Sequence, residues 1–514
     1  MRAVSVILCI WSGLVFASAH ASHSETVPLD RLNQQVLDLV RKYNYTQAGN
    51  LAEQAVAAAR SQRGEKDPDT IKALVQQGHV LIMLGRGSEA ETAAKRAIEI
   101  AEETQPADSE LLADALETLG ATALITLELH ADPADIGALQ RALVIREKHI
   151  KSNPYAYLAL FDQMTTFIVA PKAPEGCARM FVRAIGIAES ELGLGHPVIA
   201  GLLDRLGQLL SVSAFETGEF TSLDRVTDTQ KRVMAVIKDS GRAQSLRSIP
   251  EPPRPKYALF EGERYFNASR DIMDRLLASA ELDRLEPQAI LALLSPLRDL
   301  SKHLEETGRA GEAERLYIMI RDVPIQKVNT RQAAVQADGW PSAMEDLLGL
   351  YRNQNRLDAF EKLAVEATAQ VDEQLATADP PTESRTRGSR IFRRLANDYE
   401  ELGNPARAEH YWNKIIAMFE AQGDLEALAV TLADTIGIDP NNEQFLFRIK
   451  VSPQGMAGFY ERQGRWDEAE AAYRRAVDIL VQRRGADDTL VTTLKRRLSL
   501  FLERRPNAAA RQAQ

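Results

Sequence analysis

The residues best suited to bind a ligand are arginines clustered within ten residues of an acidic chain, whose net charge is −10. They are Arg385, Arg387, Arg390, Arg393 and Arg394. The last three and Asn397 are spaced i, i+3, i+4 and i+7, which places them on one face of a helix. Guanidinium groups form paired hydrogen bonds with carboxylates. Arg390, Arg393, Arg394 and Asn397 are therefore predicted to bind an anionic group of a peptide.

We expect the helix that carries these arginines to begin near Gly388 and Ser389. The amino-terminal end of a helix is electrically positive, so cations there are destabilised unless an anion approaches them. The competing interpretation is that the arginines pair with local acids such as Glu400 and Glu401. Runs of charge usually form solvated surface, which favours this second interpretation. The sequence leaves both open.

The other reactive residue types are not arranged for catalysis. Glu189 and Ser190 form a Glu-Ser pair like that of helical peptidoglycan-cleaving enzymes, but no Gly-Leu-Met-Gln-like segment follows them. No histidine beyond the first 25 residues lies three or four positions from another histidine or from Cys177, the spacing of common metal sites. The sequence also contains no nucleophile elbow, P-loop or dinucleotide motif. We therefore expect no catalytic activity, no metal and no cofactor.

Residues 1–21 have the pattern of a secretory signal peptide. Arg2 precedes an apolar stretch from Val4 to Ala17, and small residues suited to cleavage follow it. The stretch is shorter than a membrane span, although an uncleaved anchor is the alternative. We expect export, to the periplasm or to the outside of the cell, and no transmembrane segment in the mature chain. An acidic exported chain is also a poor candidate for binding nucleic acid.

The elements that must position these residues repeat along the chain. Residues 47–56 and 89–98 share one pattern of small and polar residues at a distance of 42 positions. A period of this size indicates stacked helical hairpins. In each unit a first helix ends at a Gly or Asn, and the second begins with a polar and a small residue where the helices cross. A second small residue is expected to be buried seven positions later, at Ala55, Ala97, Ala142, Ala184, Ala367 and Ala476.

The clearest copy of the unit lies at residues 456–477. Gly464 is expected to end its first helix in the left-handed conformation, and Trp466 to fill the space between the two helices. Further copies have their turn at Gly308, Asn355 and Gly403. No strand pattern bounded by Asn-Gly or Asp-Gly turns is present, so we predict an all-α fold.

These units resemble the tetratricopeptide repeat family. Residues 187–200, with His196 before Pro197, and residues 141–148 resemble the 42-residue form found in kinesin light chains. The resemblance covers most of 30–505. It implies a right-handed α-solenoid of about nine hairpins whose inner groove binds peptides or proteins.

The repeat pattern is lost at residues 214–255 and 421–452, which suggests a division of the chain. The expected parts are a signal peptide (1–21), an N-terminal array (27–240), a Pro-rich linker (246–256), a C-terminal array with a capping helix (257–505) and a disordered tail (506–514).

The family resemblance implies a non-catalytic scaffold or adaptor that binds a protein or peptide partner. Grooves of this family hold C-terminal carboxylates with Lys, Arg and Asn from first helices, which Arg390, Arg393, Arg394 and Asn397 match in part. Neighbouring first helices supply Gln454 and Glu345 in place of further cations. His79 and Met83 are additional groove candidates.

Two alternatives remain: a structural subunit of an envelope complex that self-associates through its repeat ends, and an enzyme with its site in the irregular segments. The identity of the partner and the oligomeric state cannot be read from the sequence.

Overall fold

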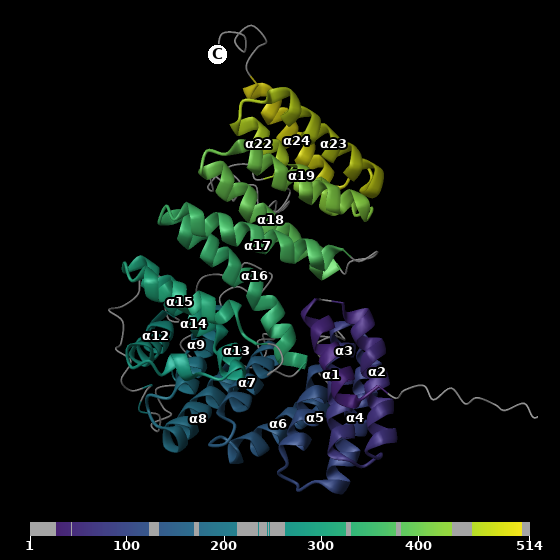
Figure 1. Cartoon of the computed structure of the whole chain (residues 1–514), viewed down its shortest axis with the longest axis vertical. Coiled ribbons are helices and arrows are strands. Elements are labelled where there is room, and N and C mark those ends of the chain that lie inside the picture. Colours follow the sequence, from purple (N-terminus) through teal and green to yellow (C-terminus); the bar gives the residue numbers. More distant parts are fainter. Residues whose placement is uncertain are drawn as a thin grey trace, which may run out of the picture.

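A computed structural model of the chain is helical throughout its described residues (Figure 1). These are residues 27–42, 44–122, 133–168, 174–212, 263–324, 330–376, 382–433 and 455–505, with isolated positions at 235, 244 and 246. Within them lie 21 α-helices, one short 3-10 helix and no strand. The predicted all-α fold is confirmed.

The N-terminal half of the chain forms successive helical hairpins. The first four are α1 (Leu29–Arg41) with α2 (Tyr45–Gln62), α3 (Pro68–Met83) with α4 (Gly87–Thr104), α5 (Glu110–Thr122) with α6 (Pro133–Lys148), and α7 (Pro154–Ile168) with α8 (Pro174–Leu192). Helix α9 (Pro197–Val212) follows and packs against α7 and α8.

The C-terminal half begins with α12 (Glu263–Ala278), the 3-10 helix Leu282–Arg284 and α13 (Pro287–Ala292). Its hairpins are α14 (Leu294–Glu306) with α15 (Ala310–Arg321), α16 (Thr330–Asn353) with α17 (Leu357–Leu375), α18 (Thr382–Glu401) with α19 (Pro405–Ala421), and α22 (Met456–Arg462) with α23 (Trp466–Arg484). Helix α20 (Leu425–Ala433) packs against α19 and α23, and α24 (Thr489–Arg504) packs against α23 at the end of the array.

The repeat pattern produces the predicted contacts at the helix crossings. Every alanine predicted to be buried is at most 1% exposed: Ala55, Ala97, Ala142, Ala184, Ala367 and Ala476. The turns inside the hairpins are also equivalent, because Gly308, Gly403 and Gly464 all have φ between +70° and +80°. Asn355 takes the same left-handed place with φ of +55°, a conformation that asparagine tolerates better than most residues.

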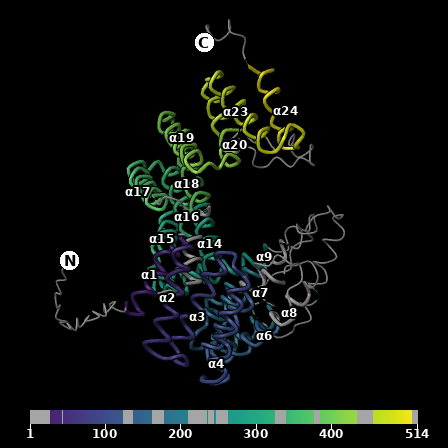
Figure 2. The backbone as a smooth tube through the Cα atoms, turned by 90° about the vertical axis from the view of Figure 1, so that its right-hand side faces the viewer, coloured from purple at the N-terminus to yellow at the C-terminus, as the bar shows by residue number. Residues whose placement is uncertain are grey.

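Helix α16 connects two bodies of helices. Helices α1–α9 and α12–α15 form a lower body in Figure 1, and α17–α24 form an upper stack, a division that Figure 2 shows from the side. Helix α16 packs against α1, α3, α13 and α15 as well as α17 and α18. Ten of the twelve residues from Trp340 to Tyr351 are buried, all except Glu345 and Asp346. A helix buried nearly all round belongs to a core and not to a surface layer.

The N-terminal hairpin reaches the upper stack through α16. Val36 and Val40 of α1 belong to the same apolar cluster as Trp340 and Met344 of α16. At the end of α1, Lys42 Nζ lies 2.7 Å from the Glu373 carboxylate of α17. Residues about 300 positions apart in the sequence are thus in direct contact, which a linear stack of repeats would not produce.

The two predicted arrays share this packing. Helix α9 of the first array lies against α12 and α14 of the second, and one apolar cluster extends from Val36 to Phe501. The expected signal peptide, the tail and the Pro-rich linker lie outside the described residues, apart from the isolated position Leu246. Their boundaries stay predictions.

Two helical glycines allow a matched test of this packing. A Cβ atom at Gly78 of α3 would lie 2.6 Å from Cγ2 of Thr118 on α5, whereas a Cβ at Gly186 of α8 would meet nothing within 4 Å. Alanine favours helix over glycine by about 1 kcal/mol. Overpacking a rigid neighbour costs about 1–3 kcal/mol. We expect Gly78→Ala to lower the thermal midpoint and Gly186→Ala to raise it or leave it unchanged. Equal effects of both substitutions would contradict the close approach of α3 and α5.

Candidate functional site

The four predicted binding residues all lie on α18, but the helix does not begin where we expected. It starts at Thr382, so Arg390 lies in its third turn and not at its amino-terminal end. Gly388 does not start the helix. It is buried, and a Cβ there would lie 2.9 Å from Val371 on α17, so its small size serves close packing. Arg390, Arg393 and Arg394 therefore lie beyond the first turn of α18, where the positive helix end has its main effect.

Two of the four residues already have carboxylate partners. Arg390 Nε donates to Glu345 Oε1 of α16 at 2.6 Å, and Arg394 Nε donates to Asp398 Oδ2 at 2.7 Å. Burial raises the pKa of Glu345 and of Asp398, and the neighbouring arginines limit that rise. Arg393 and Asn397 are partly buried on the same side of α18. Ion pairing with local acids is thus established for Arg390 and Arg394, while anion binding by the four residues stays a prediction.

Similar pairs connect successive first helices. Arg298 of α14 binds Asp346 of α16 at 2.8 Å, and Arg352 of α16 binds Asp398 of α18 at 2.6 Å. Further along, Arg462 of α22 binds Glu400 of α18 at 2.7 Å. The partners lie 46 to 62 positions apart in the sequence. These pairs form a line of alternating charges across the first helices, and they hold neighbouring repeats in register.

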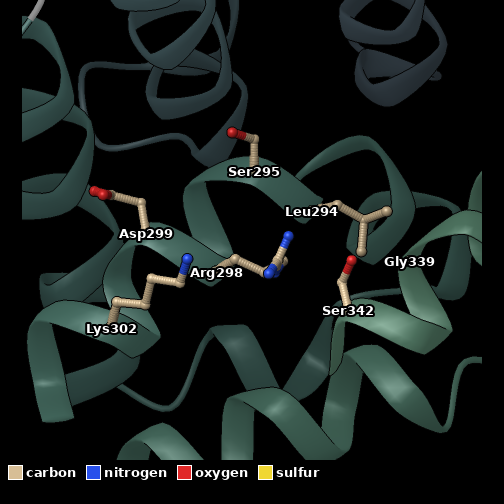
Figure 3. A pocket seen from close by; sticks show the side chains of 7 residues that line it. All are labelled: Leu294, Ser295, Arg298, Asp299, Lys302, Gly339 and Ser342. Atoms are coloured by element: carbon tan, nitrogen blue, oxygen red, sulfur yellow. The ribbon is translucent and has the colours of Figure 1, made fainter. Parts of the chain in front are cut away.

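A pocket of about 460 Å³ lies beside this line of ion pairs, between α14 and α16 (Figure 3). Its lining consists of Leu294, Ser295, Arg298, Asp299, Lys302, Gly339 and Ser342. The α14 residues among them lie nearly opposite the side of α14 that buries Leu297, Leu300 and Leu304. Arg390 reaches the same place, because its Nη2 lies 3.3 Å from Ser342 Oγ. The α14–α18 surface is the name given to Arg298, Lys302, Ser342, Glu345, Arg390, Arg393, Arg394 and Asn397 together.

Ser295, which lines the pocket, is linked through Gln208 to Asp204, a buried acid of α9. Gln208 Nε2 of α9 donates to Asp204 Oδ2 at 2.8 Å and lies 2.9 Å from Ser295 Oγ. Asp204 is 1% exposed. Burial raises the pKa of Asp204 to about 6, although the adjacent Arg205 opposes the rise.

A recurring set of one Tyr, one Glu and one Arg joins the second helix of one repeat, which carries the Glu, to the first helix of the next repeat, which carries the Tyr. Tyr351 donates to Glu314 at 2.8 Å, and Tyr460 donates to Glu409 at 3.0 Å. In each set an arginine binds the same glutamate and lies over the tyrosine ring, at 4.6 Å for Arg356 and 4.4 Å for Arg465. Tyr399, Glu361 and Arg407 repeat the arrangement. Each set therefore connects a repeat to the preceding one through hydrogen bonds and an ion pair to the same glutamate.

The N-terminal candidates lie in a different environment. His79 Nε2 is 3.2 Å from Thr118 Oγ1, and Met83 is partly buried against the main apolar core. Beside them, the buried Arg146 binds Glu117 at 2.8 Å and Asp114 at 2.5 Å. Met83 therefore contributes to packing, and His79 to a contact between α3 and α5.

Both residues of the Glu-Ser pair take part in hydrogen bonds within the chain. Glu189 Oε2 accepts the backbone N–H of Gln244 at 2.7 Å, and Ser190 Oγ bonds the neighbouring Glu191. Within the described ranges, no group of three or more His, Cys, Asp or Glu residues is placed to hold a metal ion. Nor is any described helix long and apolar enough to cross a membrane.

Sequence reasoning missed the pocket and the recurring sets. The sets have a signal, because an arginine follows the tyrosine by five positions in both Tyr351 to Arg356 and Tyr460 to Arg465. The pocket has none, because it combines residues of α14 and α16 that lie up to 48 positions apart.

Asp204 gives a pH-dependent prediction. Its folded pKa, near 6, lies above the ordinary value of 3.8, so its contribution to stability is complete at low pH and is lost as pH rises through 6. Asp204→Asn removes this titration. The unfolding free energy of the variant minus that of the native chain should rise by roughly 1–3 kcal/mol between pH 4 and 7. Urea unfolding at several pH values measures this difference. A difference that stays constant would contradict the burial of this carboxylate.

Comparison with known proteins gives two matches to tetratricopeptide repeat models, at residues 32–103 and 455–489. No curated protein matches the chain. A solved structure of kinesin light chain tetratricopeptide-like repeats from Podosopora anserina is 15% identical, with a TM-score of 0.31, covering 42% of this chain and 98% of that one.

Two longer structures align at lower scores. A monomeric mutant of IFIT1 with m7Gppp-AAAA is 13% identical, with a TM-score of 0.23, covering 88% of this chain and 90% of that one. A circular tandem repeat protein is 14% identical, with a TM-score of 0.17, covering 92% and 94%. Together with the hairpins and their buried alanines, the two model matches show that this chain contains tetratricopeptide repeats.

Proposed function

We propose that this protein is an exported, non-catalytic scaffold that binds a protein or peptide partner along the α14–α18 surface. The observation that carries the proposal is the combination of tetratricopeptide repeats with a pocket flanked by cations on consecutive first helices. Such repeats present broad surfaces, on which a few anchoring contacts supply most of the binding energy.

The lower body supports placing the partner on this surface. Helix α16 packs against α1 and α3, so the first helices of the N-terminal repeats are partly covered by the chain itself. The pocket between α14 and α16 is lined by Lys302, which is exposed to solvent, and by Ser342. A partner would therefore contact the chain where the lower body meets the upper stack.

Arg390, Arg393, Arg394 and Asn397 are the proposed contacts for an acidic or C-terminal carboxylate group of the partner. Arg390 is half exposed and is held in place by Glu345, which fixes the direction of its guanidinium group. An arginine that is oriented in advance loses less side-chain entropy when it binds. Glu345 would compete with the ligand, so the expected contribution of Arg390 is modest.

Export of the chain, with the periplasm as its location, completes the proposal. It rests on the pattern of residues 1–21, where Arg2 and the apolar stretch after it resemble a signal peptide. The compartment limits the partner to envelope or secreted proteins.

A variant of the α18 arginines tests the proposed contacts. Peptides are first selected from a random displayed library on the native chain, and their affinities are then measured by fluorescence anisotropy. We expect the triple change Arg390→Gln, Arg393→Gln and Arg394→Gln to weaken binding roughly tenfold, the loss of about one charge-assisted hydrogen bond. Arg390→Gln alone should weaken it less, without disturbing the buried Asp398.

Arg475→Gln is the matched control. Arg475 has nearly the same exposure as Arg390 and also pairs with one glutamate, Glu420, but it lies on the second helix α23. Its change should leave peptide affinity as it is. A native chain that selects no peptide would refute the scaffold function, and an unaffected triple variant with normal helicity would refute the role of α18.

A further inference from the structure

Lys302 differs from the other cations of the α14–α18 surface. Arg298, Arg390 and Arg394 have acidic partners, whereas within the described part of the chain no acid lies at ion-pair distance from Lys302. The neighbouring Asp299 does not neutralise it, because Arg270 of α12 binds that carboxylate at 2.9 Å. Figure 3 shows the Lys302 amino group directed toward the interior of the pocket. The pocket therefore carries one positive charge that the described chain leaves uncompensated.

Two further donors face the same space. Arg298 uses Nε and Nη2 for Asp346, at 2.9 and 2.8 Å, and its Nη1 has no acceptor in the described residues. Ser342 Oγ accepts from Arg390 Nη2, and no described acceptor takes its hydroxyl proton. Ser342 is 7% exposed, so an unused hydroxyl proton there is costly unless a ligand accepts it.

The opposite end of the pocket is apolar. Leu294 borders it, and Gly339 presents no side chain there; a Cβ at Gly339 would lie 3.2 Å from Leu294 Cδ1. A volume of about 460 Å³ exceeds that of one small anion and is sufficient for a side chain together with its neighbouring backbone. The shape and the donors together suit an extended peptide better than a free ion.

We propose that the pocket between α14 and α16 binds an aspartate or glutamate side chain of the partner peptide, with Lys302, Arg298 and Ser342 as the donors to its carboxylate. This inference rests on the proposed scaffold function and names the chemical group that the surface selects. The α18 arginines then lie next to this carboxylate-binding pocket, because Arg390 Nη2 donates a hydrogen bond to Ser342 Oγ.

The position of the pocket favours an internal acidic side chain over a chain end. First helices continue on both sides of it, with Gln208 of α9 beside Ser295 and Glu345 with Arg390 on the other side. A peptide lying across α9, α14, α16 and α18 would pass the pocket in mid-chain. It would also meet polar groups that its backbone can hydrogen-bond.

A double substitution, in protein and peptide, tests the proposal. The peptides selected by the native chain are synthesised with acetylated and amidated ends, in a Glu form and a Gln form. We expect Glu→Gln in the peptide to weaken binding to the native chain roughly tenfold, the loss of one charged hydrogen-bonding partner. The same peptide change should have a much smaller effect on the Lys302→Gln chain, in which only Arg298 and Ser342 remain as donors. Lys362→Gln is the matched control, since Lys362 is an exposed lysine of α17, also without a described partner, and it should retain the tenfold preference.

The outcomes separate the two proposals. If the native chain selects no peptide, both the scaffold function and this inference are refuted. If it selects peptides whose affinity does not depend on an acidic residue, or if Lys302→Gln keeps the acidic preference, only the pocket assignment is refuted. A preference for a free C-terminal carboxylate over its amide, lost in Lys302→Gln, would refute the side-chain assignment in favour of a chain-end site.

Discussion

The burial of α16 on nearly all its sides is the constraint on which the rest of the structure depends. Its segment from Trp340 to Tyr351 leaves only Glu345 and Asp346 away from the core, and both are bound by arginines of neighbouring first helices. Because α16 contacts α1 and α3 as well as α17 and α18, it couples the first hairpin to the upper stack. In a simple solenoid only adjacent repeats are in contact. In this chain α16 also contacts α1 and α3, which are distant in the sequence, so the two halves of the chain pack as one unit.

Charge is organised by the same packing. The recurring Tyr, Glu and Arg sets join a second helix to the first helix of the next repeat, and pairs such as Arg352 with Asp398 join successive first helices. Partly exposed ion pairs contribute little stability one at a time, but their geometry specifies which helix lies beside which. Most arginines are thereby occupied, so their number is a poor guide to ligand binding. Lys302 differs from these arginines because no acid of the described residues pairs with it.

The repeat and its turns could be predicted, because they are local. A small residue at a helix crossing and a glycine such as Gly464 after a first helix follow from steric rules that act within one hairpin. The start of α18 was predicted wrongly: it was placed near Gly388, whereas in the structure Gly388 lies inside the helix, where its small size allows close packing against Val371. The pocket could not be predicted, since it joins Leu294 to Ser342 through the packing of separate hairpins.

The sequence alone determined the helical class, the repeat unit, the alanine contacts and the four residues that share one face of α18. These follow from periodicities of three to four residues within helices and of about 42 residues between hairpins. Only the tertiary structure decided which charges meet. It paired Arg390 with Glu345, placed α16 between α1 and α18, and left Lys302 facing a pocket. The physical reason is that small rotations between successive hairpins accumulate along a solenoid, so contacts between distant repeats depend on the whole path of the chain.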